Sequence, residues 1–544
     1  MFIESFAGTD LMELADWMTF IDRMAQLKLN TIGVSIYGCW DIRHDGSRSE
    51  YLYTPLSRFP ELCSPQRMIT WDTVNRSQVE LIYLPKMFEK NYFGELVDYA
   101  EERGIEILPH LGGPGHSTLV PRLVPLLSAL DEDGHETGYG YCVTRETARN
   151  ALRELIRSLV HEHLKPNRIR RLHVAGDEYY PIRNVDPTDR RRIVSPYCQC
   201  PTCRDLSPGE MLTEYLLQVG ETLAEEEISM VNWHDTLVRE RALDKYLRRA
   251  KSRGIPRPVI AWWKYNDPIP VPDSSLTETW SCPTTGLFPS LFYQDFSLNI
   301  ETALRSGSKS GVAGAFAYGM PDPAHHANYA CFADLAWNLE ESGGADGFRE
   351  RWSRYITKTD PTATRHALSL AQSITGCYPL MMYLLHHLLP YFATSSAGVT
   401  TYPDDLAKAF SVTQPPLADL LRQVVDTANE AIALMPDGRE IPGWPDPVST
   451  WAAELRRLSS GANLFLDFLA VTREPGKQTR GEAQRLTDRG QTLLQSVADH
   501  KPDFLRPSVL REHWGFVREL GDASERLRSG SVVAEPETWH AWIV

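Results

Sequence analysis

Short apolar runs and amphipathic stretches alternate along residues 1–343. Each run is rich in β-forming residues and is followed by apolar residues at helical spacing. Eight runs show this pattern: 1–6, 31–37, 105–109, 169–175, 228–233, 258–263, 276–282 and 311–318. Eight strand–helix repeats predict an α/β fold, the (β/α)8 TIM barrel. A doubly wound open sheet is the alternative, although no glycine-rich phosphate turn follows the first run.

Residues 344–544 follow a different pattern. Apolar residues recur there at helical spacing, without convincing strands between them, in six stretches: 363–374, 379–389, 417–434, 450–469, 480–498 and 508–527. Such a pattern predicts an all-α region packed on the barrel. We therefore expect a barrel domain over residues 1–343 and an α-helical C-terminal domain over residues 344–544.

The charge balance narrows the classes of partner. The 544 residues include 56 Lys and Arg against 71 Asp and Glu, a formal net charge of −15, so the chain lacks the basic character of nucleic-acid-binding proteins. It has no run of about 18 apolar residues, so we expect no membrane span. The first residues show no secretory signal, and nine cysteines are few for this length, so we expect a cytoplasmic protein.

Two adjacent carboxylates, Asp177 and Glu178, follow the fourth run directly after Gly176. They could be a solvated loop pair, or could pair with the arginines at 190–192. In a barrel, however, the residues that follow the strands carry the chemistry. Two carboxylates held close together also raise the pKa of one of them, which suits a general acid. We therefore interpret this pair as candidate catalytic residues.

Tryptophans end two of the predicted strands. Trp233 ends the run 228–233, and Trp262 and Trp263 end the run 258–263. An indole face suits the apolar face of a pyranose, whereas packing in the barrel core is the alternative interpretation. Side chains alternate along a strand, so Trp262 and Trp263 cannot both point inward unless the strand has already ended. All three are candidate sugar-binding residues.

Three cysteines lie close together at Cys198, Cys200 and Cys203. This spacing could bind zinc if a histidine or a distant cysteine such as Cys142 supplied a fourth ligand. A disulfide is a second possibility. We favour reduced loop thiols, because structural zinc sites usually show two Cys-x2-Cys pairs and the chain has no second pair. We expect no bound metal and no other cofactor.

The sequence HVAGDE at 173–178 resembles the His-x-Gly-Gly-Asp-Glu signature of glycoside hydrolase family 20, the β-N-acetylhexosaminidases. Residues 107–117, with Pro-Gly-His ending at His116, resemble the family's third-strand segment. Residues 20–34 resemble its first helix and second strand. The three motifs occur in the family's order and cover roughly residues 1–340. The resemblance therefore implies a glycoside hydrolase catalytic barrel over residues 1–343.

The resemblance also implies a mechanism, in which the substrate's own acetamido oxygen attacks the anomeric carbon of a terminal β-linked N-acetylhexosamine with net retention. Glu178 would be the general acid/base, Asp177 would orient the acetamido group, and Tyr293 would hydrogen-bond to the same group. The expected partner is a carbohydrate, and the mechanism needs no cofactor. The expected substrate-binding residues are His116, His173, Trp233, Trp262, Trp263, Asp295 and Tyr318.

The chain departs from the family pattern at residues that grip the sugar hydroxyls. The family has an arginine in the first strand, where residues 3–6 offer none, and a Trp and a Glu near the eighth strand, where residues 318–320 read Tyr-Gly-Met. We therefore expect the chemistry to be retained while the sugar selection differs. One alternative is a two-carboxylate exo-glycosidase in which Asp235, Asp267 or Asp295 joins Glu178. Another is a carbohydrate-binding barrel without activity.

Overall fold

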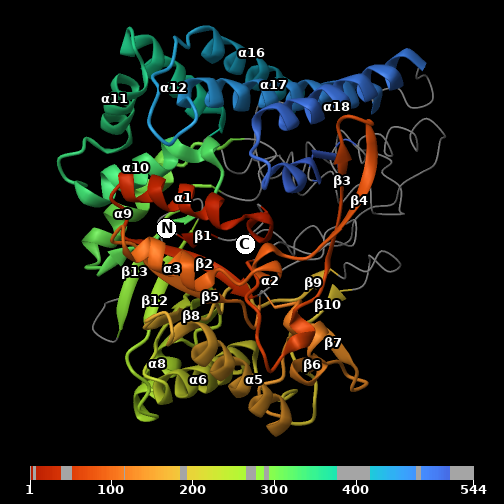
Figure 1. Ribbon diagram of the computed structural model, residues 1–544, viewed down its shortest axis with the longest axis vertical. Coiled ribbons are helices and arrows are strands. Elements are labelled where there is room, and N and C mark those ends of the chain that lie inside the picture. Colours follow the sequence, from red (N-terminus) through yellow and green to blue (C-terminus); the bar gives the residue numbers. More distant parts are fainter. Residues whose placement is uncertain are drawn as a thin grey trace.

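The computed structural model describes most of the chain. The described residues are 2–3, 8–37, 52–115, 117–183, 193–264, 277–286, 293–375, 417–472, 480–511, 513–514 and 517. Two of the predicted residues, His116 and Asp267, lie outside them, as does the predicted helix 379–389. Within the described part, a curled sheet is surrounded by helices, and a group of long helices from the end of the chain lies along one side (Figure 1).

The central sheet is entirely parallel. Its strand order is β14-β13-β12-β11-β8-β5-β2-β1-β15, which follows the sequence without a reversal and therefore excludes the doubly wound alternative. The strands are β1 (Phe2–Ile3), β2 (Thr31–Tyr37), β5 (Glu106–Leu111), β8 (Arg171–His173), β11 (Ser229–Trp233), β12 (Val259–Trp263), β13 (Glu278–Cys282), β14 (Gly314–Ala315) and β15 (Tyr318–Gly319).

The eighth predicted run is split into two short strands. β14 pairs with β13 at one edge of the sheet, and β15 pairs with β1 at the other edge. The same short segment, 314–319, therefore contacts both edges, and the sheet curls in the manner of a TIM barrel. The carboxyl ends of all these parallel strands consequently lie at one end of the curled sheet.

Helices follow the strands and cover the sheet. Apolar residues on one face of each helix explain this packing: in α1, for example, Trp17, Ile21 and Met24 are fully buried at helical spacing. α1, α9 and α10 lie on the side facing the C-terminal helices, and α5, α6 and α8 lie on the opposite side (Figure 1). The helices are α1 (Leu14–Gln26), α3 (Phe93–Glu101), α5 (Glu146–Leu159), α6 (Pro208–Glu225), α8 (Leu243–Ser252), α9 (Ser297–Lys309) and α10 (His326–Trp337).

Among the described residues, three antiparallel hairpins interrupt this alternation, and each follows a central strand. They are β3 (Gln66–Asp72) with β4 (Ser77–Tyr83), β6 (Ser128–Leu130) with β7 (Glu136–Tyr141), and β9 (Ile182–Arg183) with β10 (Ile193–Val194). The β3–β4 hairpin extends toward the C-terminal helices (Figure 1), where Trp71 stacks on Trp514 with ring centroids 4.4 Å apart. These insertions therefore lie at the end of the sheet where a site is expected.

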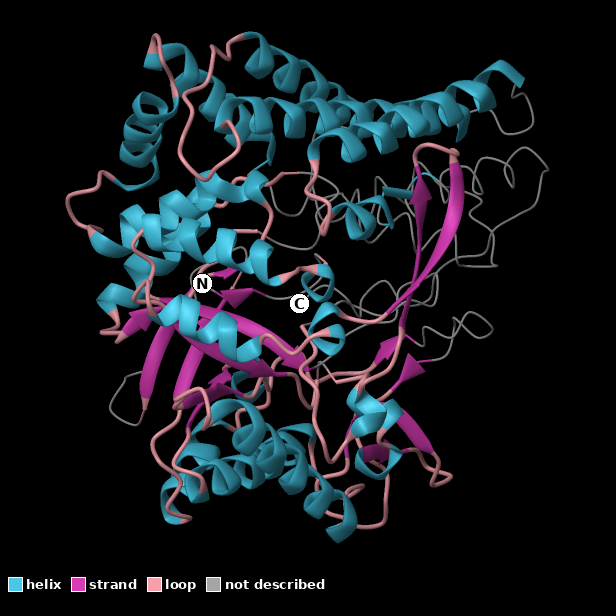
Figure 2. Ribbon diagram, viewed as in Figure 1, coloured by secondary structure: helices cyan, strands magenta, loops and turns pink. Residues whose placement is uncertain are grey.

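The described residues after 343 form helices and connecting loops (Figure 2). They include α11 (Gly344–Ile356), α12 (Pro361–Thr375), α16 (Leu417–Ala433), α17 (Pro447–Thr472) and α18 (Arg480–His500). One continuous apolar core joins barrel residues to Phe348 of α11 and Phe465 of α17. The domain boundary at 343/344 stays a prediction. Among the described residues, no helix combines the length and the apolar character that crossing a bilayer requires.

Candidate active site

The segment that carries Asp177 and Glu178 leaves β8 through a strained turn. Hydrogen bonding to β11 continues past the strand, where the Ala175 carbonyl accepts from the N–H of Trp233 at 2.9 Å. The backbone then turns, with φ of +55° at Ala175, +91° at Gly176 and +43° at Glu178. Side-chain-bearing residues at such angles cost about 1–3 kcal/mol each, and such strain clusters at functional sites. The turn presents the two carboxylates at the carboxyl end of the sheet.

The predicted third-strand motif packs directly against this turn. The N–H of Gly176 donates to the carbonyl of Gly113 at 2.9 Å. At Gly115, a Cβ would lie 2.1 Å from the carbonyl oxygen of Asp177, so only glycine fits there. The glycines of the motif therefore allow two neighbouring strand ends to approach closely. His116, which follows them, lies outside the described residues.

A third carboxylate, Asp235, holds the turn from the other side. Asp235 begins the short helix α7 (Asp235–Arg239) after β11, and its Oδ2 accepts the N–H of Glu178 at 2.9 Å. The N–H of the next residue, Tyr179, donates to Oγ1 of Thr236 at 3.2 Å. Asp177 is buried, with 8% of its surface exposed, and Glu178 is half-buried. Asp235 therefore positions the main chain that carries Glu178.

Tyr180 is a site residue that sequence reasoning missed. Burial and then the nearby charges of Glu178 and Asp235 raise its pKa well above the usual value, so its hydroxyl stays protonated beside two carboxylates. The guanidinium of Arg239 lies 5.7 Å from the centre of its ring. The only signal in the sequence is its position two residues after Glu178.

Neutral aromatic rings line the neighbouring strand ends. The ring of His173 lies 4.4 Å from that of Trp233 and 4.8 Å from that of His110, and burial lowers the pKa of His173 to about 3. One strand further, the ring of His234 stacks on Trp262 at 4.4 Å. Burial lowers the pKa of His234 to about 3 as well. His173 is therefore neutral and packed among aromatic rings.

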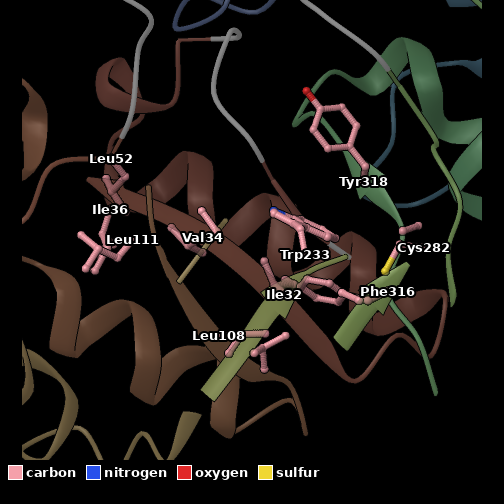
Figure 3. Close-up of a cluster of buried hydrophobic side chains, with 14 of the residues drawn as sticks. Ile32, Val34, Ile36, Leu52, Leu108, Leu111, Trp233, Cys282, Phe316 and Tyr318 are labelled. Carbon is pink, nitrogen blue, oxygen red and sulfur yellow. The ribbon is translucent and has the colours of Figure 1, made fainter. Parts of the chain in front are cut away.

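The three predicted tryptophans differ in exposure. Trp233 and Trp262 are buried, and Trp263 is half-buried with its ring 6.2 Å from that of His234. Trp233 lies among the core side chains Ile32, Val34 and Phe316 (Figure 3). Packing in the core of the curled sheet thus accounts for much of the surface of Trp233. A sugar-binding role for the tryptophans stays a prediction.

Two of the predicted site residues, Tyr293 and Tyr318, come from the segments after β13. Tyr293 is fully buried, stacks on His325 at 5.9 Å and meets the edge of Trp451 of α17 at 6.4 Å. Burial raises the pKa of Tyr293 well above its usual value. Tyr318 lies in β15, and its ring points away from Phe316 and Cys282 (Figure 3).

Asp295 has a local structural role. Its Oδ1 accepts the N–H of Ser297 at 2.9 Å and the hydroxyl of Ser297 at 2.6 Å, at the beginning of α9. A carboxylate at this place satisfies an amide that has no partner within the helix. The structure therefore joins Asp177, Glu178, His173, Trp233 and Asp235 by contacts around β8 and β11. That Tyr293 and Tyr318 share one pocket with them stays a prediction.

A buried charge cluster follows β15, and sequence reasoning missed it. Nζ of Lys501 lies 2.5 Å from Oδ2 of Asp322 and 2.9 Å from Oε1 of Glu454, which also pairs with Arg457. Burial lowers the pKa of Lys501 to about 8 and that of His325 to about 4. Although burial alone would raise it, the charge of Lys501 lowers the pKa of Asp322 to about 2. The cluster therefore ties the end of the sheet to the C-terminal helices.

Comparison with known proteins gives one family match. Residues 10–267 match the model described as glycosyl hydrolase family 20, catalytic domain. No curated protein matches the chain. Among solved structures, the chain is similar to a Streptomyces plicatus β-hexosaminidase mutant in complex with GlcNAc (13% identity, 63% of this chain and 64% of that chain, TM-score 0.38).

Two further solved structures show a comparable likeness. One is the GH20 β-N-acetylhexosaminidase of Streptomyces coelicolor A3(2), with 15% identity over 63% of this chain and 65% of that chain and a TM-score of 0.38. The other is a GH138 enzyme targeting pectin rhamnogalacturonan II, with 10% identity over 89% of this chain and 57% of that chain and a TM-score of 0.46. The chain thus spans less than two thirds of the length of each.

Proposed function

We propose, because residues 10–267 match the family model of the glycosyl hydrolase family 20 catalytic domain, that the protein is a retaining glycoside hydrolase acting on a terminal β-linked N-acetylhexosamine. The observation that carries the proposal is the strained turn at the end of β8, which lies inside the matched segment and presents Asp177 and Glu178 together. We further propose that the fold is a complete eight-stranded barrel closed by segment 314–319, followed by an α-helical domain.

The proposed reaction has two steps. In the first, the acetamido oxygen of the sugar attacks the anomeric carbon, the glycosidic bond breaks, and Glu178 gives its proton to the leaving oxygen. In the second, Glu178 takes a proton from water, and that water opens the cyclic intermediate with net retention. Asp177 accepts the N–H of the acetamido group and balances the positive charge that develops there. Tyr293 donates its hydroxyl hydrogen to the same group.

The contacts of the other carboxylates favour this route over the two-carboxylate alternative. Asp235 already accepts the main-chain N–H of Glu178, and Asp295 already accepts from Ser297 at the start of α9. Both carboxylates therefore already accept hydrogen bonds that stabilise the local main chain. Asp267 lies outside the described residues. The adjacent Asp177 remains as the acidic partner of Glu178.

Strain argues against a carbohydrate-binding barrel without activity. A left-handed backbone at Glu178 costs about 1–3 kcal/mol, and a binding surface gains nothing from this cost. A catalytic acid, by contrast, must project from the sheet at a fixed angle toward the glycosidic oxygen.

The experiment is a panel of nitrophenyl β-glycosides that differ at carbon 2 and carbon 4. Turnover of acetamido sugars alone supports the proposal. Turnover of plain hexosides would support the two-carboxylate alternative, and binding without turnover would support the non-catalytic one. The Glu178→Gln protein, prepared in parallel, is the control for contaminating glycosidases, because its preparation carries the same contaminants.

A further inference from the structure

Four buried cysteines converge next to the candidate site. Cys142, Cys198, Cys200 and Cys203 have sulfur atoms that all lie within 4.8 Å of one another. Sγ of Cys142 lies 3.8 Å from that of Cys200 and 3.9 Å from that of Cys203. Four thiolates around zinc at about 2.3 Å would be about 3.8 Å apart in a tetrahedron. We propose that these cysteines hold one structural zinc ion.

The other two interpretations, a disulfide and reduced loop thiols, explain the cluster less well, and all four cysteines are free of disulfides in the structure. A disulfide needs sulfur atoms about 2.05 Å apart, and Cys142 is nearly twice that distance from Cys200 and from Cys203. Reduced thiols are weak hydrogen-bond donors and acceptors, so four of them gain little from contact with one another. Connectivity does not force the contact either, because Cys142 lies 58 residues before Cys200. A cation that binds all four explains why they meet.

Polar groups around the cluster suit thiolate ligands. The N–H of Leu130 donates to Sγ of Cys198 at 3.4 Å, and the N–H of Arg145 donates to Sγ of Cys142 at 3.5 Å. Oγ1 of Thr144 lies 2.9 Å from Sγ of Cys203. Arg145, whose main-chain N–H contacts Cys142, also brings a cationic residue next to the cluster. These donors would stabilise a centre of four thiolates and Zn²⁺, whose net charge is −2.

The cluster joins two loops that border the candidate acid. Cys142 follows β7 in the insertion after β5, and the other three cysteines precede α6 in the loop after β8. The second loop holds the residue next to Glu178: the Tyr179 hydroxyl donates to the carbonyl of Pro196 at 3.1 Å, and the Tyr197 hydroxyl donates to the carbonyl of Tyr179 at 3.0 Å. From the first loop, the hydroxyl of Tyr139 donates to the carbonyl of Tyr180 at 2.9 Å.

We infer that the zinc ion positions the acid loop without touching the substrate. It would hold the two loops in one arrangement, and their tyrosines would hold the main chain at 179–180. This part of the inference rests on the proposed function, whereas the zinc site itself does not. Metal content and thermal stability need no substrate, so failure of the zinc site is distinguishable from failure of the proposed activity.

The first test is the metal content of the full-length protein, expressed with added zinc and desalted. We expect about one zinc per chain by plasma mass spectrometry, and less than about 0.2 in Cys200→Ser, because loss of one thiolate opens the site. The matched control is Cys331→Ser, another buried free cysteine outside the cluster, which should keep about one zinc. Wild-type protein without zinc, or with iron instead, would overturn the assignment.

The second test is the consequence of zinc loss, measured on wild-type protein before and after removal of zinc with a thiol reagent and chelator. We expect Tm to fall by more than about 5 °C, since a metal bound only by the folded state stabilises it. We also expect kcat to fall more than KM changes, with recovery on adding Zn²⁺ after reduction. An unchanged Tm would contradict the structural role, whatever the activity.

Discussion

Different kinds of interaction build two regions of the candidate site, here called the first edge (around β8 and β11) and the second edge (from β13 to β15). At the first edge, main-chain hydrogen bonds and left-handed backbone angles hold Asp177 and Glu178, and the neighbouring His173 is neutral. At the second edge, Tyr293 packs against Trp451 of α17. Asp322 pairs there with the buried cation of Lys501, which follows α18. The first edge is strained and local, whereas the second depends on distant parts of the chain.

The family match divides the molecule at the same place. It ends at residue 267, after β12 and before β13, so the acid loop lies inside it and Tyr293 lies outside it. The end of the family match therefore falls between the two edges. We therefore expect the first edge to hold Asp177 and Glu178 for the proposed chemistry, and the second edge, supported by the C-terminal helices, to set which sugar fits.

The largest expected effect concerns the first edge. Glu178→Gln keeps the shape of the side chain but removes the transferable proton, so we expect a loss of about 10²–10⁴-fold in kcat. Glycosides with poor leaving groups should lose most, and nitrophenyl glycosides least. Steady-state rates on both substrate types measure this difference. Near wild-type rates on the poor leaving groups would remove Glu178 from the mechanism.

At the second edge, we expect a substitution in the buried charge cluster to lower the free energy of unfolding. Lys501→Met leaves Asp322 and Glu454 buried without their shared cation, so we expect a loss of about 3–5 kcal/mol in the free energy of unfolding. The matched control is Lys245→Met, whose exposed pair with Glu210 should contribute no more than about 1 kcal/mol. Urea titration of both variants measures the difference. Equal losses would contradict the view that buried charges hold this edge.

A third prediction separates the roles of the two carboxylates within the first edge. Asp177→Asn removes the charge that balances the developing cation, and we expect about 10²–10³-fold slower hydrolysis of N-acetyl substrates. A thiazoline that mimics the cyclic intermediate should bind the wild type tightly and the variant poorly. If thiazoline binds both proteins equally, measured by calorimetry, Asp177 does not contact the acetamido group.

The last prediction concerns the pH dependence of stability, to which both edges contribute. Burial lowers the pKa to about 3 for His173 and His234 at the first edge, and to about 4 for His325 and His326 at the second. Below about pH 6.5 the unfolded chain binds protons that the folded protein does not, so stability should fall between pH 6.5 and 4. The slope should reach about 1.4 kcal/mol per pH unit for each histidine.

Urea titration at pH 7, 6 and 5 measures this slope. His326→Gln should reduce it by one histidine's share. A stability that does not change between pH 7 and 5 would show that the histidines are protonated in the folded state.

The sequence predicts what depends on local patterns. The spacing of Trp17, Ile21 and Met24 predicts a helix that the structure confirms as α1, and each predicted strand run overlaps a strand of the central sheet. The turn carrying Asp177 and Glu178 can likewise be predicted from the sequence, because glycines and a strand end are local signals. These features need no knowledge of distant contacts.

Contacts between distant segments could not be read in this way. Lys501 meets Asp322 across 179 residues, and no spacing rule relates the two. The sequence offers Cys142 as a distant fourth ligand, but only the packing of two loops brings it to Cys200. The role of Asp235 also needed the structure, because its partner is a main-chain N–H at Glu178.

The measurement that tests the central claim most directly is the rate of hydrolysis of nitrophenyl N-acetylhexosaminides whose acetyl group carries zero, one, two or three fluorines. Fluorine withdraws electrons from the acetamido oxygen without changing the leaving group. If that oxygen is the nucleophile, kcat/KM falls steeply with each fluorine. A rate that stays constant across the series would contradict substrate assistance, and a second carboxylate would then have to act as the nucleophile.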